Sequence, residues 1–245
     1  ASDVLYTYSG VRPLPYVPDI GEWKVPRSHV IFDHAPARPG LLSIIGGKLS
    51  TYRSLAEDAV DELFKQLGKK APACTTRKIK FPGARVADFE GYKAELSKTF
   101  GVASSLSERL VSIYGARAGD ILALGQSQPE LMNVLDHESG AIAAELVFTF
   151  ENEFCRTLTD ALIRRIMVGL NGSCGREVLD EAVNILAERT GWPEARKQAE
   201  KEDYLQYIKR FDVPGFESQS TEPAPNSPQE KASSSALINS KLEKI

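Results

Sequence analysis

The chain has 245 residues, 42% apolar and 26% charged, the balance of a globular protein long enough to bury a substantial core. Thirty basic and 33 acidic side chains leave a formal charge of −3, so no overall positive field would attract nucleic acid. No apolar run approaches the roughly 18 residues that a membrane-spanning helix needs. The three cysteines lack C-x-x-C spacing, which argues against a disulfide framework or zinc knuckle and favours a reducing, cytoplasmic compartment.

The first 45 residues carry short β-type runs separated by proline and glycine. Strands are predicted at Val4–Tyr8, His29–Asp33 and Leu41–Ile45, the last a continuous apolar run typical of a strand buried on both faces. The sequence starts at Ala1 without an initiator methionine, and its first eight residues already have the pattern of the middle of a β-strand. We therefore expect it to be a fragment of a longer protein.

An amphipathic helix is predicted directly after these strands. Apolar residues recur from Tyr52 to Leu67 with the 3.6-residue period of a helix that buries one face. Ser50 and Thr51 are candidate caps at its start, and Gly68 is a candidate end. The local order is thus strand, turn and helix.

The remainder divides into a helical part and a polar tail. Apolar stripes at helical spacing predict an all-α bundle over 88–212, with helices that include 141–152 and 157–170. The tail over 213–245 is rich in Ser, Pro, Gln and Glu, so we expect it to be disordered. The predicted fold is an α/β fragment of strands plus one helix over 1–80, followed by this bundle and the tail.

The turn between the third strand and the helix carries the most informative chemistry, in Gly46, Gly47, Lys48, Ser50 and Thr51. Glycines permit positive φ angles and close approach of the backbone to a ligand. A helix start with a nearby lysine and hydroxyls suits an oxyanion, or a ring that gains negative charge during a reaction. The segment is neither a P-loop nor G-x-G-x-x-G. A tight turn whose glycines serve packing fits equally well.

Two arginines are candidate anion ligands. Arg12 is held between Val11 and Pro13, and Arg27 precedes a predicted strand. Guanidinium binds phosphate or carboxylate through two parallel hydrogen bonds, although solvated arginines or structural ion pairs are commoner. His29 is expected to be structural. No metal-ligand spacing is present, so no metal site is predicted.

Four segments together resemble one flavoprotein family. They are T-Y-S-G-V-R-P-L (Thr7–Leu14), P-R-S-H-V-I (Pro26–Ile31), G-L-L-S-I-I-G-G-K-L-S-T-Y-R-S-L-A-E-D-A-V-D (Gly40–Asp61) and E-x-x-x-T-L-x-D-A-L-x-R-R (Glu153–Arg165). Their order and separation resemble the C-terminal part of FAD-dependent, aerobic-type glycerol-3-phosphate dehydrogenases, which are D-amino-acid-oxidase-like flavoproteins. The resemblance covers about residues 3–190.

The resemblance implies a cofactor role for the glycine turn. Gly46, Gly47, Lys48, Ser50 and Thr51 would lie against the pyrimidine end of the flavin ring, with the following helix facing the flavin. The N-terminal region that carries G-x-G-x-x-G and the expected general base is missing from this sequence. No catalytic residue is therefore assigned, and the chain alone is expected to be inactive and to bind no FAD.

For the substrate, the resemblance implies that Arg12 and Arg27 bind the phosphate of sn-glycerol 3-phosphate. The full-length enzyme would oxidise this substrate to dihydroxyacetone phosphate with hydride transfer to FAD, and electrons would leave to quinone or oxygen. Peripheral association with the cytoplasmic face of a membrane and a homo-oligomer are compatible with the resemblance. No segment shows a large basic amphipathic face that would itself predict membrane contact.

Two other functions stay open. The chain could be a non-catalytic docking or oligomerisation module built on the helical bundle. It could also belong to an amino-acid or amine oxidase of the same fold, in which Arg12 would hold a carboxylate and Arg27 would be dispensable.

Overall fold

A computed structural model describes residues 4–11, 13–16, 19, 21, 24–25 and 28–212. Arg12, Arg27 and the tail over 213–245 lie outside the described residues, so the expectation of a disordered tail is not addressed. The chain divides into two compact units, one formed by residues 1–7 with 210–245 and the other by residues 8–209.

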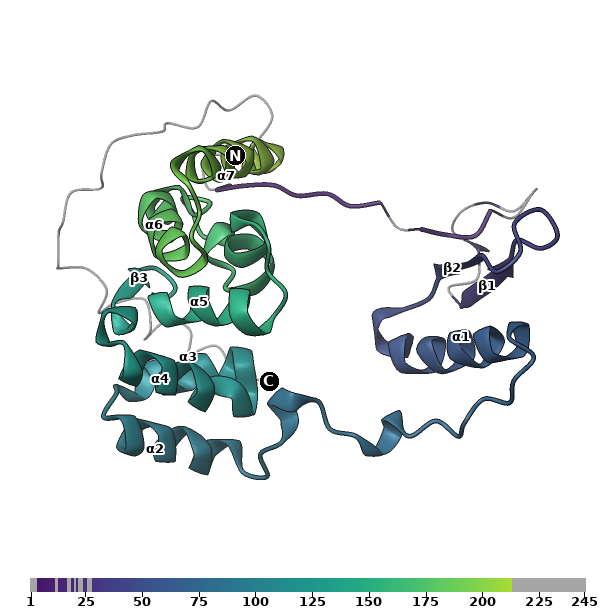
Figure 1. Cartoon of the computed structure of the whole chain (residues 1–245), viewed down its shortest axis with the longest axis horizontal. Coiled ribbons are helices and arrows are strands. Elements are labelled where there is room, and N and C mark those ends of the chain that lie inside the picture. The colour runs from purple at the N-terminus through teal and green to yellow at the C-terminus, as the bar shows by residue number, and fades with distance from the viewer. Residues whose placement is uncertain are drawn as a thin grey trace, which may run out of the picture. The chain divides into compact units, whose positions relative to one another are not determined.

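The described part is mostly helical, with two small antiparallel strand pairs (Figure 1). Its α-helices are α1 (Tyr52–Gln66), α2 (Phe89–Phe100), α3 (Ser104–Tyr114), α4 (Ala118–Ser127), α5 (Ala143–Asn152), α6 (Leu179–Thr190) and α7 (Glu194–Ile208). Its strands are β1 (His29–Asp33), β2 (Leu42–Gly46), β3 (Val134–Asp136) and β4 (Ala141–Ile142). The second and third predicted strands are therefore confirmed to within one residue.

The prediction of a strand at Val4–Tyr8 is wrong. In the smaller unit the Thr7 N–H donates to the Phe211 carbonyl at 2.9 Å, and the Tyr6 ring meets the Phe211 ring edge-on at 6.2 Å. Among the described residues, the segment is also held by the Thr7 hydroxyl, which donates to the Asp212 carbonyl at 3.4 Å. These few contacts leave it extended without the ladder of backbone hydrogen bonds that a strand requires.

In the larger unit β1 and β2 form a hairpin with helix α1 on one face. The register pairs His29 with Gly46 and Ile31 with Ile44. No described residue between 4 and 81 is fully buried, and Ile44 is 47% exposed. The expectation that this strand is covered on both faces is therefore wrong for this chain. A two-stranded hairpin is only marginally stable by itself, which indicates that more of a sheet is needed to cover it.

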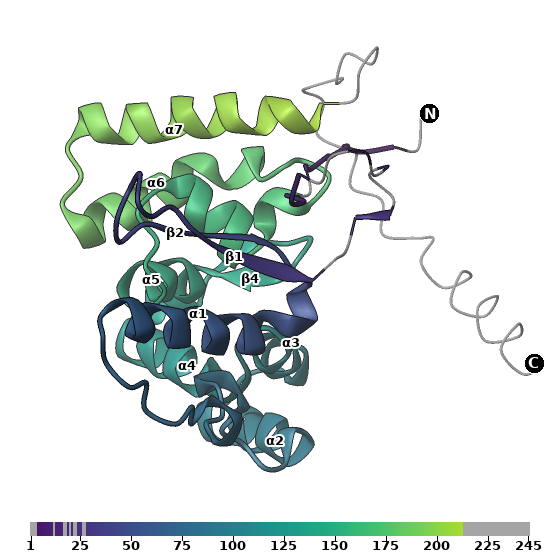
Figure 2. The ribbon, with the colours of Figure 1, turned by 90° about the vertical axis from the view of Figure 1, so that its right-hand side faces the viewer.

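Helices α2 to α7 form the main core. Consecutive helices contact one another, and α2 and α7 lie at opposite ends of the stack in both views (Figures 1 and 2). The interior consists of aliphatic and aromatic side chains at the predicted helical spacing, among them Leu110, Ile121, Leu122, Leu146, Phe148, Leu162, Leu186 and Tyr204. The helices predicted over 141–152 and 157–170 contribute Leu146 and Leu162 to this core, whereas Ile121 and Leu122 lie on α4, which was not predicted as a separate helix.

The bundle is not all helical, in contrast to the prediction. The β3–β4 hairpin lies before α5, and its turn is closed by the Asp136 carboxylate, which accepts from the Ser139 N–H at 2.8 Å. Gly140 completes this turn at φ +72°. The helix predicted over 157–170 is also interrupted: a π-helix spans Asp160–Arg165, and Met167 at φ +59° ends it.

Candidate functional site

The turn after β2 is built from two residues with positive φ. Gly46 has φ +77° and Gly47 has φ +88°, angles that L side chains rarely adopt. A Cβ on Gly46 would lie 3.0 Å from the Ser28 carbonyl oxygen, and one on Gly47 would lie 3.1 Å from Leu55 Cδ1. Both packing and conformation therefore require glycine, and they leave the backbone here bare of side chains.

Thr51 locks the residues that follow this turn. The Lys48 N–H donates to Thr51 Oγ1 at 3.2 Å, while that hydroxyl donates to the Lys48 carbonyl at 2.9 Å. The Thr51 N–H also donates to the Lys48 carbonyl at 2.9 Å. A 3-10 turn over Leu49–Thr51 then runs directly into α1. The Thr51 hydroxyl thus stabilises the turn. Thr51 was predicted to be a helix cap and a flavin ligand, and its contacts with Lys48 were not predicted.

Lys48 and Ser50 are exposed at the same end of α1. Lys48 forms no ion pair within the residues that the structure describes. The Thr51 and Tyr52 N–H groups are engaged on the Lys48 and Leu49 carbonyls of the 3-10 turn, but the start of the helix still carries a partial positive charge. A bare glycine backbone, the positive end of α1 and the Lys48 ammonium group would together stabilise negative charge on a flat ring or an anion, so the residues present fit the flavin that the resemblance implied.

A histidine–carboxylate pair joins the hairpin to α1 beside this turn. His29 Nε2 lies 2.9 Å from Asp58 Oδ2, and His29 Cβ would lie 3.4 Å from a Cβ on Gly47. His29 therefore has the structural partner that was expected of it. Asp58 was missed by sequence reasoning because it is one of many charged residues on α1, and nothing local links it to β1.

The other predicted ligands, Arg12 and Arg27, lie outside the described residues. Among the residues that are described, no group of three or more His, Cys, Asp and Glu could hold a metal ion. Within the described part of the chain, Cys74, Cys155 and Cys174 form no disulfide. No described helix is long and apolar enough to cross a membrane.

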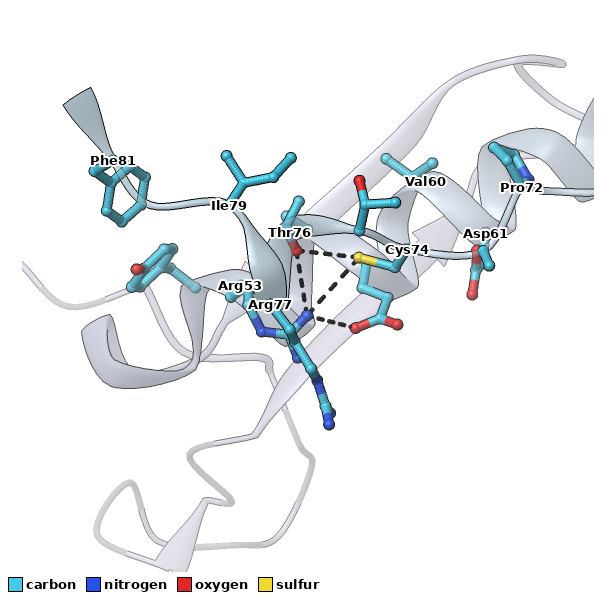
Figure 3. A pocket seen from close by; sticks show the side chains of 14 residues that line it. Arg53, Val60, Asp61, Pro72, Cys74, Thr76, Arg77, Ile79 and Phe81 are labelled. Atoms are coloured by element: carbon cyan, nitrogen blue, oxygen red, sulfur yellow. Dashed lines mark hydrogen bonds and ion pairs between the residues drawn. The ribbon is translucent and has the colours of Figure 1, made fainter. Parts of the chain in front are cut away.

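A second feature is a hollow whose lining residues start at Tyr52, directly after the turn. A hollow of about 680 Å³ lies between α1 and the segment over 72–81 (Figure 3). At its polar end Arg53 Nη1 donates to Glu57 Oε2 at 2.7 Å and to Thr76 Oγ1 at 3.3 Å. The hydrogen bond to Glu57 raises the pKa of Arg53 above its ordinary value. The contact between Arg53 and Thr76 ties the 72–81 segment to α1.

Comparison with known proteins identifies a family for much of the chain. Residues 74–197 match the sequence model of the C-terminal domain of alpha-glycerophosphate oxidase. The match covers all but the first two residues of the 72–81 segment, helices α2 to α6 and the first four residues of α7. The glycine turn lies before it.

Relatives extend the similarity across the glycine turn. A glycerol-3-phosphate dehydrogenase from Synechocystis sp. is 34% identical over 221 residues, which are 87% of this chain and 39% of that protein. A mitochondrial glycerol-3-phosphate dehydrogenase from Arabidopsis thaliana is 29% identical over 86% of this chain and 35% of its own length. The chain therefore spans about two fifths of the length of such relatives.

A solved structure agrees with these relatives. The glycerol-3-phosphate dehydrogenase from Bacillus halodurans, determined in complex with FAD, superimposes with a TM-score of 0.57 at 25% sequence identity. The alignment covers 72% of this chain and 37% of that one. The similarity thus extends to the fold.

Proposed function

This chain belongs to the family of the C-terminal domain of alpha-glycerophosphate oxidase, and we propose that it is the C-terminal part of an FAD-dependent sn-glycerol-3-phosphate dehydrogenase. The observation that carries the proposal is the glycine turn, where Gly46 and Gly47 present bare backbone beside Lys48 and the start of α1. Relatives that share this region are named glycerol-3-phosphate dehydrogenases, and the structural neighbour was determined with FAD.

In this proposal the chain supplies one wall of the cofactor site. Gly46, Gly47 and Lys48 would hold the flavin ring together with Ser50 and the positive end of α1. When bound, FAD would accept the hydride released as glycerol 3-phosphate is oxidised to dihydroxyacetone phosphate. Lys48 and the helix start favour negative charge on the adjacent ring, while Thr51 keeps the turn in shape.

The two arginines would supply the substrate phosphate site. Guanidinium stays charged at all working pH values and pairs with phosphate through parallel hydrogen bonds, so Arg12 and Arg27 would fix the substrate by its dianionic end. Binding of the phosphate would orient the carbon that loses hydride, although the two arginines would not contact that carbon. Electron transfer onward to quinone or oxygen, attachment to a membrane surface and a homo-oligomeric state belong to the proposal for the full-length enzyme.

Replacement of Arg27 tests the substrate assignment. In the full-length enzyme Arg27→Leu should raise the KM for glycerol 3-phosphate by about a hundredfold, because a hydrogen bond to a charged group is worth about 1.5–3 kcal/mol. Arg38→Leu removes another exposed arginine from the β1–β2 connection and should leave KM unchanged. If Arg27→Leu has no effect on KM, an amino-acid or amine oxidase of the same fold would be the better assignment.

A further inference from the structure

One residue of β1 lies against both glycines of the glycine turn. His29 is the first residue of β1 and pairs with Gly46 across the hairpin. A Cβ built on Gly46 would lie 3.9 Å from His29 Cα, and one built on Gly47 would lie 3.4 Å from His29 Cβ. The place of His29 therefore limits where the backbone of both glycines can lie.

Helix α1 borders the same turn and runs alongside the hairpin (Figure 1). Leu55 Cδ1 would lie 3.1 Å from a Cβ on Gly47. Asp58 follows Leu55 by three residues on α1, so the two side chains share one face of the helix. The space beside Gly47 is thus bounded by β1 and by α1, and a change in the separation of these elements would alter it.

A polar contact joins the two elements at this point. His29 Nε2 lies 2.9 Å from Asp58 Oδ2, and the side chains are 19% and 56% exposed. Among the residues that the structure describes, no Lys or Arg forms an ion pair with Asp58, whereas Glu62 on the same helix pairs with Lys65. The Asp58 carboxylate therefore engages His29.

An imidazole suits this contact because its ring is rigid. A carboxylate can only accept, so His29 Nε2 carries the proton, and both the neutral and the protonated ring can donate it in a hydrogen bond. The bond restrains His29 Cβ, the atom of this residue that borders Gly47. A lysine would reach Asp58 through a flexible stem and would leave its own Cβ less restrained.

We propose that His29 and Asp58 are positioning residues, which act through Gly47 to hold the glycine turn against the flavin ring. The inference rests on the proposed function, because it takes this turn as a wall of the cofactor site. Ion pairs with an exposed partner add little to the stability of a fold. The main effect of this pair is therefore on the geometry of the site, where small displacements weaken binding.

Flavin binding by the full-length enzyme tests the proposal. Titration of the apoenzyme with FAD, followed by flavin fluorescence, gives the dissociation constant. His29→Ala and Asp58→Ala should each raise this constant about tenfold, as expected for loss of a hydrogen bond to a charged group. His29→Gln should restore it to within about twofold, because the Gln amide can donate from a position close to that of Nε2.

A double variant and a matched control separate this pair from a general loss of charge. His29→Ala/Asp58→Ala should bind FAD no more weakly than either single variant, because the two residues act as one unit. Glu62→Ala removes another carboxylate of α1, together with its ion pair to Lys65 at 3.0 Å, and should leave the FAD constant unchanged. Equal losses in Glu62→Ala and Asp58→Ala would overturn the inference, and so would a His29→Gln variant that fails to restore binding.

Two further results distinguish the possible failures. Each apoenzyme variant should unfold in urea at the midpoint of the unaltered apoenzyme, and a midpoint that falls in step with FAD affinity would show a merely structural role. If the unaltered full-length protein bound no FAD, the proposed function would fail and this inference with it. If it bound FAD and His29→Ala bound equally well, the positioning role alone would fail.

Discussion

At the scale of single residues, Gly47 combines a positive φ with a crowded Cβ position. Its φ is +88°, and a Cβ there would meet both Leu55 and His29. Gly47→Ala should lower the flavin content of the full-length enzyme and destabilise it by about 1–3 kcal/mol, because a strained residue would be forced into a crowded space. The bound flavin per protein and a urea unfolding curve measure these effects.

Gly40 provides the matched control for this substitution. Its φ is +83°, yet nothing lies within 4 Å of a Cβ built there. Gly40→Ala therefore carries the backbone strain without the crowding, and it should retain full flavin content. Equal flavin loss in both variants would show that the glycine turn has no special relation to the cofactor.

Asp160 gives a residue-level prediction for pH. Burial tends to raise its pKa, but hydrogen bonds from the Arg156 and Thr157 N–H groups, the Thr157 hydroxyl and the charge of Arg164 lower it overall. A folded-state pKa below the unfolded value stabilises the fold above the unfolded pKa and loses that contribution as pH falls. Asp160→Asn should cost about 1 kcal/mol at neutral pH and less in acid. A cost independent of pH would contradict this account.

The sequence predicted only some of the residues at the site. Gly46 and Gly47 could be identified from the local sequence alone, because two glycines between an apolar run and a helical apolar stripe are typical of a turn between a strand and a helix. The His29–Asp58 pair could not, because it depends on how α1 packs on β1. The same holds for Arg53 and Thr76, which meet across a connection that has no regular period.

At the scale of elements, the start of α5 is fixed by one buried carboxylate. Glu145 accepts from the Ile142 N–H at 3.0 Å and from the Tyr114 hydroxyl at 2.8 Å, and it forms an ion pair with Arg109. Burial and the Glu145 charge raise the pKa of Tyr114, so this hydroxyl remains a donor at any working pH. Helices α3 and α5 are thereby joined by polar contacts inside an apolar core.

Removal of this carboxylate should be costly. Glu145→Ala leaves Arg109 and the Ile142 N–H without their acceptor, and should lower the free energy of unfolding by about 3–5 kcal/mol. Chemical denaturation of the chain measures the loss. Glu188→Ala, which alters an exposed residue of α6, should change stability by less than about 0.5 kcal/mol. Similar values for both variants would rule out a central role for the Glu145 network.

The elements that sequence reasoning located are those with a sustained period. Helix α1 and the core helices repeat apolar residues every 3.6 positions, and the two β-runs before the glycine turn are confirmed. The β3–β4 hairpin was missed because its strands are three and two residues long and depend on the Asp136 turn. The π-helix after Thr159 was missed because it keeps a helical apolar pattern while its hydrogen bonding changes.

At the scale of the whole molecule, apolar surface is distributed unevenly. The bundle buries most of its large apolar side chains, although Phe154 is 84% exposed, whereas no described residue of the hairpin or α1 is fully buried and Val30, Phe32 and Leu63 are all more than 40% exposed. Exposed apolar area of this kind usually marks a surface that packs against more protein. We therefore expect the chain mixed with FAD to show no stoichiometric flavin spectrum, and a yellow complex would refute this expectation.

The most direct measurement is anaerobic reduction of the flavin in the full-length enzyme. Addition of sn-glycerol 3-phosphate should bleach the absorbance of oxidised FAD, whereas glycerol and amino acids should not. Lys48→Met should slow the bleaching at saturating substrate, because Lys48 favours negative charge on the ring. Arg27→Leu should instead require far more substrate for the same rate. Bleaching by an amino acid but not by glycerol 3-phosphate would contradict the assignment of this chain to a glycerol-3-phosphate dehydrogenase.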